Sequence, residues 1–191
     1  MKKNIGSELG MCPTPVVVVG TYDGNGKPNM ATLAWVGVCC SNPPSVQVSI
    51  RKSRYTYAAI AIRKAFSVNV PSARYIVETD YAGVVSGKDA DKFGVTKLTP
   101  VRCSMIDAPM IMEFPISMEC RLTHTLELGT HDMFVGEIVA CWVDDTVLDG
   151  NGRPVPQKID PLVYAIGRGY YGLGSFVAAS HDVGKKLWYK S

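Results

Sequence analysis

The sequence lacks the short motifs that mark the common nucleotide-dependent and hydrolytic enzymes. It contains no Walker loop, no Gly-x-Ser-x-Gly elbow, no His-Glu-x-x-His, and no Gly-x-Gly-x-x-Gly that joins a predicted strand to a predicted helix. We therefore do not expect a Rossmann-type nicotinamide domain, and any chemistry has to be sought in less specific patterns.

Long apolar runs and long basic runs are also missing. No apolar stretch approaches the roughly 18 to 20 residues that a membrane-spanning helix needs. The start Met1-Lys2-Lys3 is followed by polar residues rather than by the apolar region of an export signal. The net charge of +3 is spread along the chain, so the cations suit a local anion site better than a nucleic-acid partner. We predict a cytoplasmic protein.

Cysteine pairs of the Cys-x-x-Cys type are absent. The six cysteines are Cys12, Cys39, Cys40, Cys103, Cys120 and Cys141. Their spacing does not suit zinc or a cluster, and we expect reduced, buried thiols rather than disulfides. No metal site is predicted.

The chain does have a mainly β pattern. Its 191 residues, 47% of them hydrophobic, suffice for one core, so residues 1–191 are expected to form a single domain. Eighteen Gly, twelve Pro and short β-branched runs between turn signals favour strands over a helical bundle. Because strands outnumber helices, and the helices lie in the connections, we predict a β-barrel with a few covering helices.

The order of elements follows from the same patterns. A hairpin is expected where strands at 16–22 and 28 to about 38 flank Asp23-Gly24-Asn25-Gly26. The remaining expectations are strands at 46–50, 66–70, 110–128 with an interruption at Pro115, 134–143 and 162–166, helices at 55–64 and 74–85, and a short helix or turn at 89–93. Residues 170–174 are expected to be irregular, and 185–191 to form an exposed end or a partner contact.

The stretch Ser49-Ile50-Arg51-Lys52-Ser53-Arg54-Tyr55-Thr56 is the most informative one. It places three cations and several hydroxyl groups between a strand end and a helix start. The first turn of a helix leaves backbone N–H groups free, and arginine adds bidentate hydrogen bonds to phosphate oxygens. The segment therefore fits a phosphate site, although a solvated basic loop would have the same composition.

Three further segments carry weaker signals. In Asn29-Met30-Ala31-Thr32-Leu33-Ala34-Trp35, small residues would let a flat ring approach the backbone, and an ordinary half-buried strand is the alternative. The segment from Ser86 to Phe93 could close over a phosphate or ribityl chain, or be a helix cap and a charged turn. His131 could deliver a proton near neutral pH, or be an ordinary turn residue.

Taken in order, these segments resemble the flavin reductase-like FMN-binding proteins, especially the flavoredoxin subgroup. The matching segments are the hairpin with 29–35, Ser41-Asn42-Pro43-Pro44 with 46–50, Arg54-Tyr55-Thr56, Phe66-Ser67-Val68-Asn69, Ser86-Gly87-Lys88-Asp89, and His131-Asp132 with Gly136. The resemblance covers roughly residues 10 to 175 and leaves a tail at 176–191. It implies a Greek-key split β-barrel that forms a homodimer and binds FMN near the subunit interface.

The resemblance also implies a role for each matching residue. Those that would line the isoalloxazine are Asn29, Met30, Ala31, Thr32, Leu33, Ala34 and Trp35. The other cofactor-binding residues would be Ser49 and Ile50 at the strand end, Arg51, Ser53, Arg54 and Thr56 at the phosphate, Asn69, and Ser86, Lys88 and Lys92, which would close the site. His131 would be the catalytic residue near the flavin and the nicotinamide. Thr130 stands where the family has an acidic residue.

Three functions remain open at this point. A flavin reductase would use NADH or NADPH to reduce the flavin, and His131 favours it. A flavoredoxin-type electron carrier would keep FMN bound and exchange electrons with a redox protein partner, as Thr130 favours. The third hypothesis is a barrel that binds another anion, or none, and has a structural or interaction role. A missing acid–base constellation is compatible with redox chemistry, because the flavin itself accepts the hydride.

Overall fold

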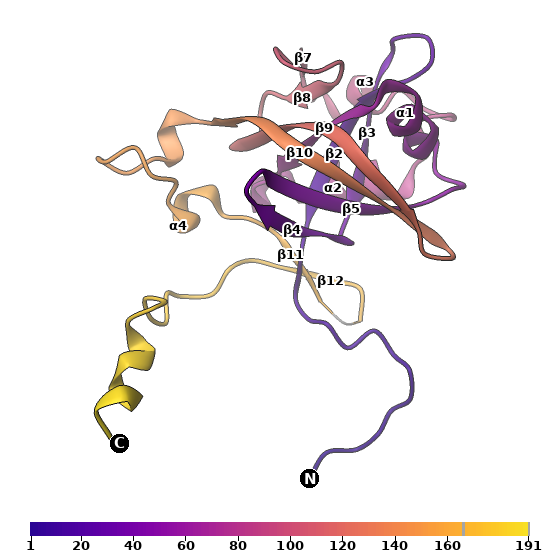
Figure 1. Ribbon diagram of the computed structural model, residues 1–191. Coiled ribbons are helices and arrows are strands. Elements are labelled where there is room, and N and C mark those ends of the chain that lie inside the picture. The colour runs from indigo at the N-terminus through magenta and orange to yellow at the C-terminus, as the bar shows by residue number, and fades with distance from the viewer. Residues whose placement is uncertain (166, 191) are drawn as a thin grey trace.

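The centre of the protein is a seven-stranded antiparallel sheet, seen in a computed structural model that describes residues 1–165 and 167–190 (Figure 1). The strands lie in the order β3 (Pro28–Leu33), β2 (Val17–Tyr22), β6 (Ala65–Val70), β9 (Ile116–Glu127), β10 (His131–Val143), β5 (Pro44–Arg51) and β4 (Val36–Ser41). Only Ala34 and Trp35 separate β3 from β4, yet these strands are the two edges of the sheet. The sheet must therefore curl until its edges come close, which makes an open barrel.

Two predicted strands are each two strands in the structure. The strand expected at 28 to about 38 is wrong because the chain bends at Ala34 and Trp35 and crosses from one edge of the sheet to the other. The strand expected at 110–128 divides into β8 (Pro109–Ile111) and β9, because a turn and bend occupy residues 112–115, which include the interruption predicted at Pro115. The strand expected at 134–143 begins earlier, at His131, so that this residue is part of β10 rather than of the bend.

The helices lie in the connections, as predicted. They are α1 (Tyr55–Arg63), the 3-10 turn η1 (Ala73–Tyr75) that leads into α2 (Ile76–Val84), and α3 (Lys92–Thr96). The short helix expected at 89–93 starts later because Asp91 is its N-cap and accepts a hydrogen bond from the backbone N–H of Gly94 at 3.2 Å.

Two small sheets and three short helical segments complete the chain. β1 (Thr14–Pro15) pairs with β11 (Val163–Ala165), which pairs with β12 (Gly169–Tyr171), and β7 (Pro100–Arg102) pairs with β8. The helical segments are η2 (Asp145–Val147), α4 (Pro156–Ile159) and η3 (Val183–Lys190).

The β11–β12 hairpin corrects two expectations. β11 is not the last strand, and the segment expected to be irregular begins with β12. Ile166 of the expected strand 162–166 and Ser191 of the tail lie outside the described residues. Residues 167–172 have Gly-x-Gly-x-x-Gly spacing, but they belong to this hairpin and not to the start of a helix, so the dinucleotide-binding geometry is not built.

The barrel interior is an apolar core. Phe66, Phe134 and Val48 are fully buried there, with Ile60 of α1 packed against them. A second cluster, which includes Met30, Ala82 and Phe93, packs β3 against α2 and α3. Together the two clusters fix the positions of β3, α1, α2 and α3.

Gly20 allows β8 to lie directly on β2. A Cβ atom at Gly20 would lie 2.1 Å from the carbonyl oxygen of Pro109, whereas a Cβ at Gly24 would touch nothing within 4 Å. Because the clash involves backbone, it cannot be relieved by a side-chain rotation. We expect Gly20→Ala to lower the free energy of unfolding by about 3 kcal/mol or more, and Gly24→Ala to change it by less than about 0.5 kcal/mol. Equal urea midpoints for the two variants would contradict the close packing.

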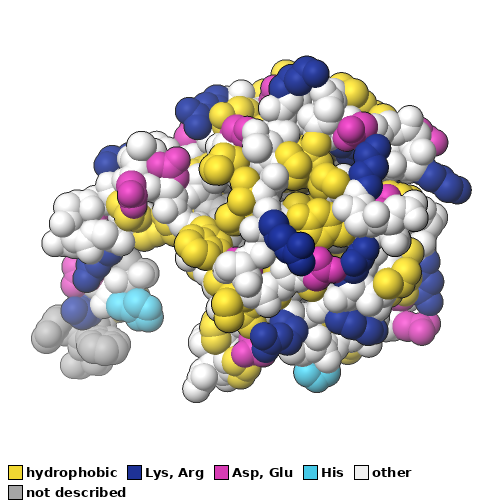
Figure 2. All heavy atoms as spheres, turned by 90° about the horizontal axis from the view of Figure 1, so that it is seen from above, with side chains coloured by type: hydrophobic (Ala, Val, Ile, Leu, Met, Phe, Trp, Pro, Cys, Tyr) yellow, Lys and Arg dark blue, Asp and Glu magenta, His cyan; other side chains and the backbone are white. Residues whose placement is uncertain are grey.

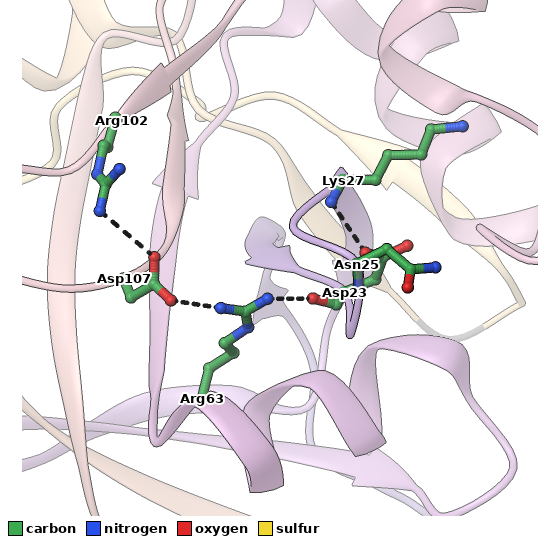
Figure 3. A network of polar contacts seen from close by, with 6 residues as sticks. All are labelled: Asp23, Asn25, Lys27, Arg63, Arg102 and Asp107. Atoms are coloured by element: carbon green, nitrogen blue, oxygen red, sulfur yellow. Dashed lines mark hydrogen bonds and ion pairs between the residues drawn. The ribbon is translucent and has the colours of Figure 1, made fainter.

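Helix α1 is held at both ends by Asp23 in the β2–β3 turn. The Tyr55 hydroxyl, at the start of the helix, donates to the Asp23 carboxylate at 2.8 Å. Arg63, at its end, donates to the Asp23 carbonyl at 2.5 Å and to the Asp107 carboxylate at 2.7 Å (Figure 3). The direction in which the first turn of α1 points is therefore fixed by the turn of a neighbouring hairpin.

The cysteines do not all behave as expected. Cys103 and Cys120 are buried, but Cys12, Cys39, Cys40 and Cys141 are exposed, and all six are free. Burial raises the pKa of the Cys103 thiol to about 12, so this thiol stays protonated at neutral pH. No helix within residues 1–165 and 167–190 is long and apolar enough to cross a membrane. On the face drawn in Figure 2, Lys and Arg side chains are spread among hydrophobic and acidic ones.

Candidate flavin site

A cleft of about 700 Å³ opens where the bend between β3 and β4 faces the start of α1 and the end of α2. The β11–β12 hairpin borders it through Tyr164, Arg168 and Tyr170. Fourteen predicted site residues line this cleft: Ala31, Thr32, Leu33, Ala34, Trp35, Ser49, Ile50, Arg51, Ser53, Arg54, Thr56, Ser86, Lys92 and His131. The fold thus brings together segments that are more than a hundred residues apart in the chain.

Four predicted residues do not line the cleft. Met30 is fully buried in the second core cluster. Asn69 is also fully buried, and its amide bonds Val18, Ser67, Ile111 and Ser117, which is a structural role. Asn29 lies just behind the lining, against Thr56.

Lys88 is the fourth of these residues. It faces an adjoining cavity of about 210 Å³, which shares four lining residues with the cleft: Ser53, Arg54, Tyr55 and Ser86.

The start of α1 forms one end of the cleft. Arg54 is the N-cap residue, and no side chain caps the helix. Because the first N–H groups of a helix have no partner within it, those of Tyr55 and Thr56 are available to a ligand. The Tyr57 N–H donates to the Arg54 carbonyl at 3.0 Å. Free N–H groups beside Arg51, Ser53 and Arg54 make an anion-binding end.

Lys92 adds a buried cation at the same end. It is 4% exposed, and its Nζ donates at 2.7 Å to the carbonyl oxygens of Met30 and of Ala82. Burial, and then the charge of Arg54, lower the pKa of Lys92 to about 8. No carboxylate pairs with Lys92 in the described part of the chain. Two neighbouring cations without an acidic partner favour an anion between them.

Trp35 and His131 form an aromatic part of the cleft lining, and His131 is the cross-strand partner of Arg51. The rings of Trp35 and His131 are nearly parallel, with 5° between the planes and 5.9 Å between the centroids. Burial, and then the charge of Arg51, lower the pKa of His131, so the imidazole is neutral at neutral pH. Trp35 is 45% exposed. A flat ring in the cleft would therefore meet an aromatic surface with a neutral hydrogen-bonding group beside it.

Asp132 points to the other face of β10, as expected for neighbours on a strand. It is 1% exposed and accepts a hydrogen bond from the Tyr57 hydroxyl at 2.6 Å. Lys52 lies 3.5 Å from the same carboxylate oxygen. Asp132 thus ties the start of β10 to α1 and is not a proton partner of His131.

Sequence reasoning missed eleven of the 25 residues that line the cleft. The missed lining residues are Val16, Tyr55, Asp80, Ala82, Gly83, Val84, Val85, Gly87, Tyr164, Arg168 and Tyr170. Those on α2 carry no polar motif, and they reach the cleft because the end of α2 lies beside β3. Those on the hairpin had a signal in Gly167-Arg168-Gly169-Tyr170, which is a turn between aromatic residues.

The family of this chain is identified by its similarity to known proteins. The sequence model of the flavin reductase like domain matches residues 9–174. The chain belongs to the flavin reductase-like family. The flavoredoxin of Desulfovibrio vulgaris (Miyazaki F) superposes with a TM-score of 0.92 at 44% identity, over 96% of this chain and 100% of that one. The flavoredoxin of Methanosarcina acetivorans gives 0.92 at 36% identity, over 98% and 99%.

A curated relative has a named activity. The flavin reductase (NADH) of Kitasatospora aureofaciens is 27% identical over 165 residues, which are 83% of this chain and 75% of that protein. The predicted mainly β split barrel is thereby confirmed, as is the predicted class of flavin-dependent oxidoreductase or electron carrier.

The residues of the cleft fit a flavin nucleotide. The anion-binding end suits a phosphate, and the small residues Ala31 and Ala34 let a flat ring approach the backbone of β3 and of the bend that follows it. The Thr56 hydroxyl accepts from Asn29, so its hydrogen is free for the ligand. The phosphate and the ring therefore each have a chemical counterpart in the cleft.

Proposed function

We propose that this protein binds FMN in the cleft and takes electrons from NADH or NADPH through it. The observation that carries the proposal is the pair of unpaired cations, Lys92 and Arg54, beside the uncapped start of α1. A flavin that ends in a phosphate monoester would neutralise both cations and accept hydrogen bonds from the free N–H groups. Trp35 and His131 would then face the redox-active ring.

The protein's own part in the reaction is binding, orientation and access. Bound flavin supplies hydride acceptance and electron transfer in one- or two-electron steps. Lys92 and Arg54 fix the phosphate, while Ala31 and Ala34 let the ring lie close to the backbone. Neutral His131 is placed to hold a hydrogen bond to the ring or to a nicotinamide amide, and Trp35 limits the access of water.

The deciding experiment is an absorption spectrum of the purified protein with FMN, followed by anaerobic addition of NADH or NADPH. Bound FMN that is bleached within seconds supports the reductase. Bound FMN that stays oxidised until dithionite is added contradicts the nicotinamide step, and no binding of FMN contradicts the whole proposal.

The second candidate is an electron carrier that exchanges electrons with a redox protein partner. The flavoredoxins that superpose over nearly the whole chain favour it, and so does Thr130, whose hydroxyl lies 3.0 Å from Nδ1 of His131 where the family has an acidic group. FMN that copurifies and is reduced by a protein donor, but not by NADH or NADPH, would support this candidate.

His131 has a separable role in the reductase. We expect His131→Gln to lower the rate of FMN reduction by NADH about 100-fold, since a positioned proton or hydrogen-bond donor contributes that much or more. The affinity for FMN should change less than threefold, because the phosphate end is untouched. Stopped-flow reduction at 450 nm measures the rate, and His124→Gln, at an exposed histidine that does not line the cleft, is the matched control. An unchanged rate would remove His131 from the reaction.

We further propose a cytoplasmic single-domain protein that works as a homodimer. Open-barrel edges need cover, and the β4 edge exposes Val38 at 80%. Beyond β12, Leu173, Phe176 and Val177 are exposed as well, in a segment that extends away from the barrel (Figure 1). Light scattering should give twice the chain mass of 20.7 kDa. A mass of one chain would contradict the dimer.

A further inference from the structure

Asn29 lies behind the anion-binding end of the cleft, where it cannot reach solvent. It is 4% exposed, and its Nδ2 donates to Oγ1 of Thr56 at 3.0 Å. Thr56 itself is only 2% exposed but still lines the cleft, in the first turn of α1. The two residues come from β3 and α1, so this bond joins the two walls of the cleft.

The bond determines how the Thr56 hydroxyl is used. A threonine hydroxyl has one hydrogen and two acceptor lone pairs. Since Oγ1 already accepts from Asn29, its hydrogen is left for another acceptor, and among residues 1–165 and 167–190 no group receives it. The open side of Thr56 is the cleft, next to the charges of Arg54 and Lys92. The acceptor that completes this arrangement is an oxygen of the bound anion.

Gly87 keeps the Asn29 amide in place. A Cβ atom at Gly87 would lie 2.1 Å from Oδ1 of Asn29, so only glycine lets the backbone after α2 pack on this amide. Oδ1 is buried and has no hydrogen-bond partner. Leaving a buried acceptor unpaired costs stability. In this protein the unpaired acceptor belongs to an amide that is held between Gly87 and Thr56.

We propose that Asn29 is a positioning residue for phosphate recognition: it holds the Thr56 hydroxyl as a donor to the terminal phosphate, and so makes the site prefer FMN to riboflavin. This inference rests on the proposed function. Asn29 does not touch the ligand but acts through Thr56. It therefore differs from the isoalloxazine contact that the resemblance implies for this residue.

The test compares FMN with riboflavin, which lacks the phosphate. Asn29→Leu and Thr56→Val should each weaken FMN binding about 10- to 150-fold, as expected for one hydrogen bond to a charged group. Riboflavin binding should change less than about twofold. Because Asn29 acts through Thr56, the double variant should bind FMN no more weakly than Thr56→Val alone. Quenching of flavin fluorescence measures all of these affinities.

Asn29→Asp provides a variant of nearly unchanged shape. Its carboxylate would accept a hydrogen bond from the Thr56 hydroxyl and turn that hydrogen away from the cleft. The affinity for FMN should therefore fall further than in Asn29→Leu, while the affinity for riboflavin should again be unchanged. Additive losses in the double variant, or equal losses of FMN and riboflavin, would overturn the role of Asn29. Failure of the unmodified protein to bind either flavin would instead refute the proposed function.

Discussion

Replacing Lys92 by glutamine is expected to weaken FMN binding about 10- to 150-fold at pH 7, which corresponds to the roughly 1.5–3 kcal/mol of a hydrogen bond to a charged group. Lys92 is the most buried cation of the cleft, and screening by water is weak there. Glutamine keeps amide N–H donors for the carbonyl groups of Met30 and Ala82, so it removes the charge with the least disturbance of the walls. Isothermal titration calorimetry with FMN and riboflavin gives both affinities.

Two controls make this result specific. In Lys92→Gln the affinity for riboflavin should fall less than about threefold, because riboflavin has no phosphate for Lys92 to neutralise. Lys88→Gln removes a neighbouring cation that is exposed and faces only the smaller cavity. This variant should therefore lower the affinity for FMN less than about threefold. If riboflavin and FMN weaken together, Lys92 supports the walls rather than the phosphate.

Much of the fold could be predicted because local patterns coincide with tertiary contacts. The turn Asp23-Gly24-Asn25-Gly26 and its flanking β-branched residues specify a hairpin in any context, and β2 and β3 do form it. The helix at 55–64 is confirmed within one residue. The cations that the sequence associates with an anion lie just before its first turn, and Arg54 is its N-cap residue.

The errors arise where tertiary structure overrides the local pattern. The run from Pro28 to Val38 has the pattern of one strand. Nothing local indicates that the chain passes from one edge of the sheet to the other at Ala34 and Trp35. The same crossing brings Trp35 beside His131, which is distant in sequence. β12 was missed for a related reason, because it is too short to show a period and forms by pairing with β11.

Residue type alone also cannot separate a lining residue from a core residue. Asn69 and Asn29 are both buried polar residues on strands that resemble those of the family. Only the partners distinguish them, since Asn69 is fully bonded within the core and Asn29 ends on a cleft hydroxyl. Lys92 shows the opposite case, where a lysine that looks like part of a charged turn is buried at 4% exposure.

The affinity for FMN is expected to fall as the pH rises from 8 to 9.5. The pKa of Lys92 is lowered to about 8 by burial and by Arg54, and a bound phosphate would raise it again, because an opposite charge favours the protonated amine. Above pH 8 the free protein must therefore take up a proton when FMN binds. By linkage the dissociation constant should increase up to about tenfold per pH unit over this range.

The sign of the effect distinguishes it from a general loss of stability. In the free protein Lys92 has a lower pKa than in the unfolded chain, so its contribution disfavours folding below pH 8 and is relieved as the pH rises. The free protein should thus gain stability from this group over the same interval in which FMN binding weakens. Titrations between pH 7 and 9.5 should show the decline for FMN, little change for riboflavin, and a flat profile for Lys92→Gln. A decline of the same size in Lys92→Gln would assign the titration to another group.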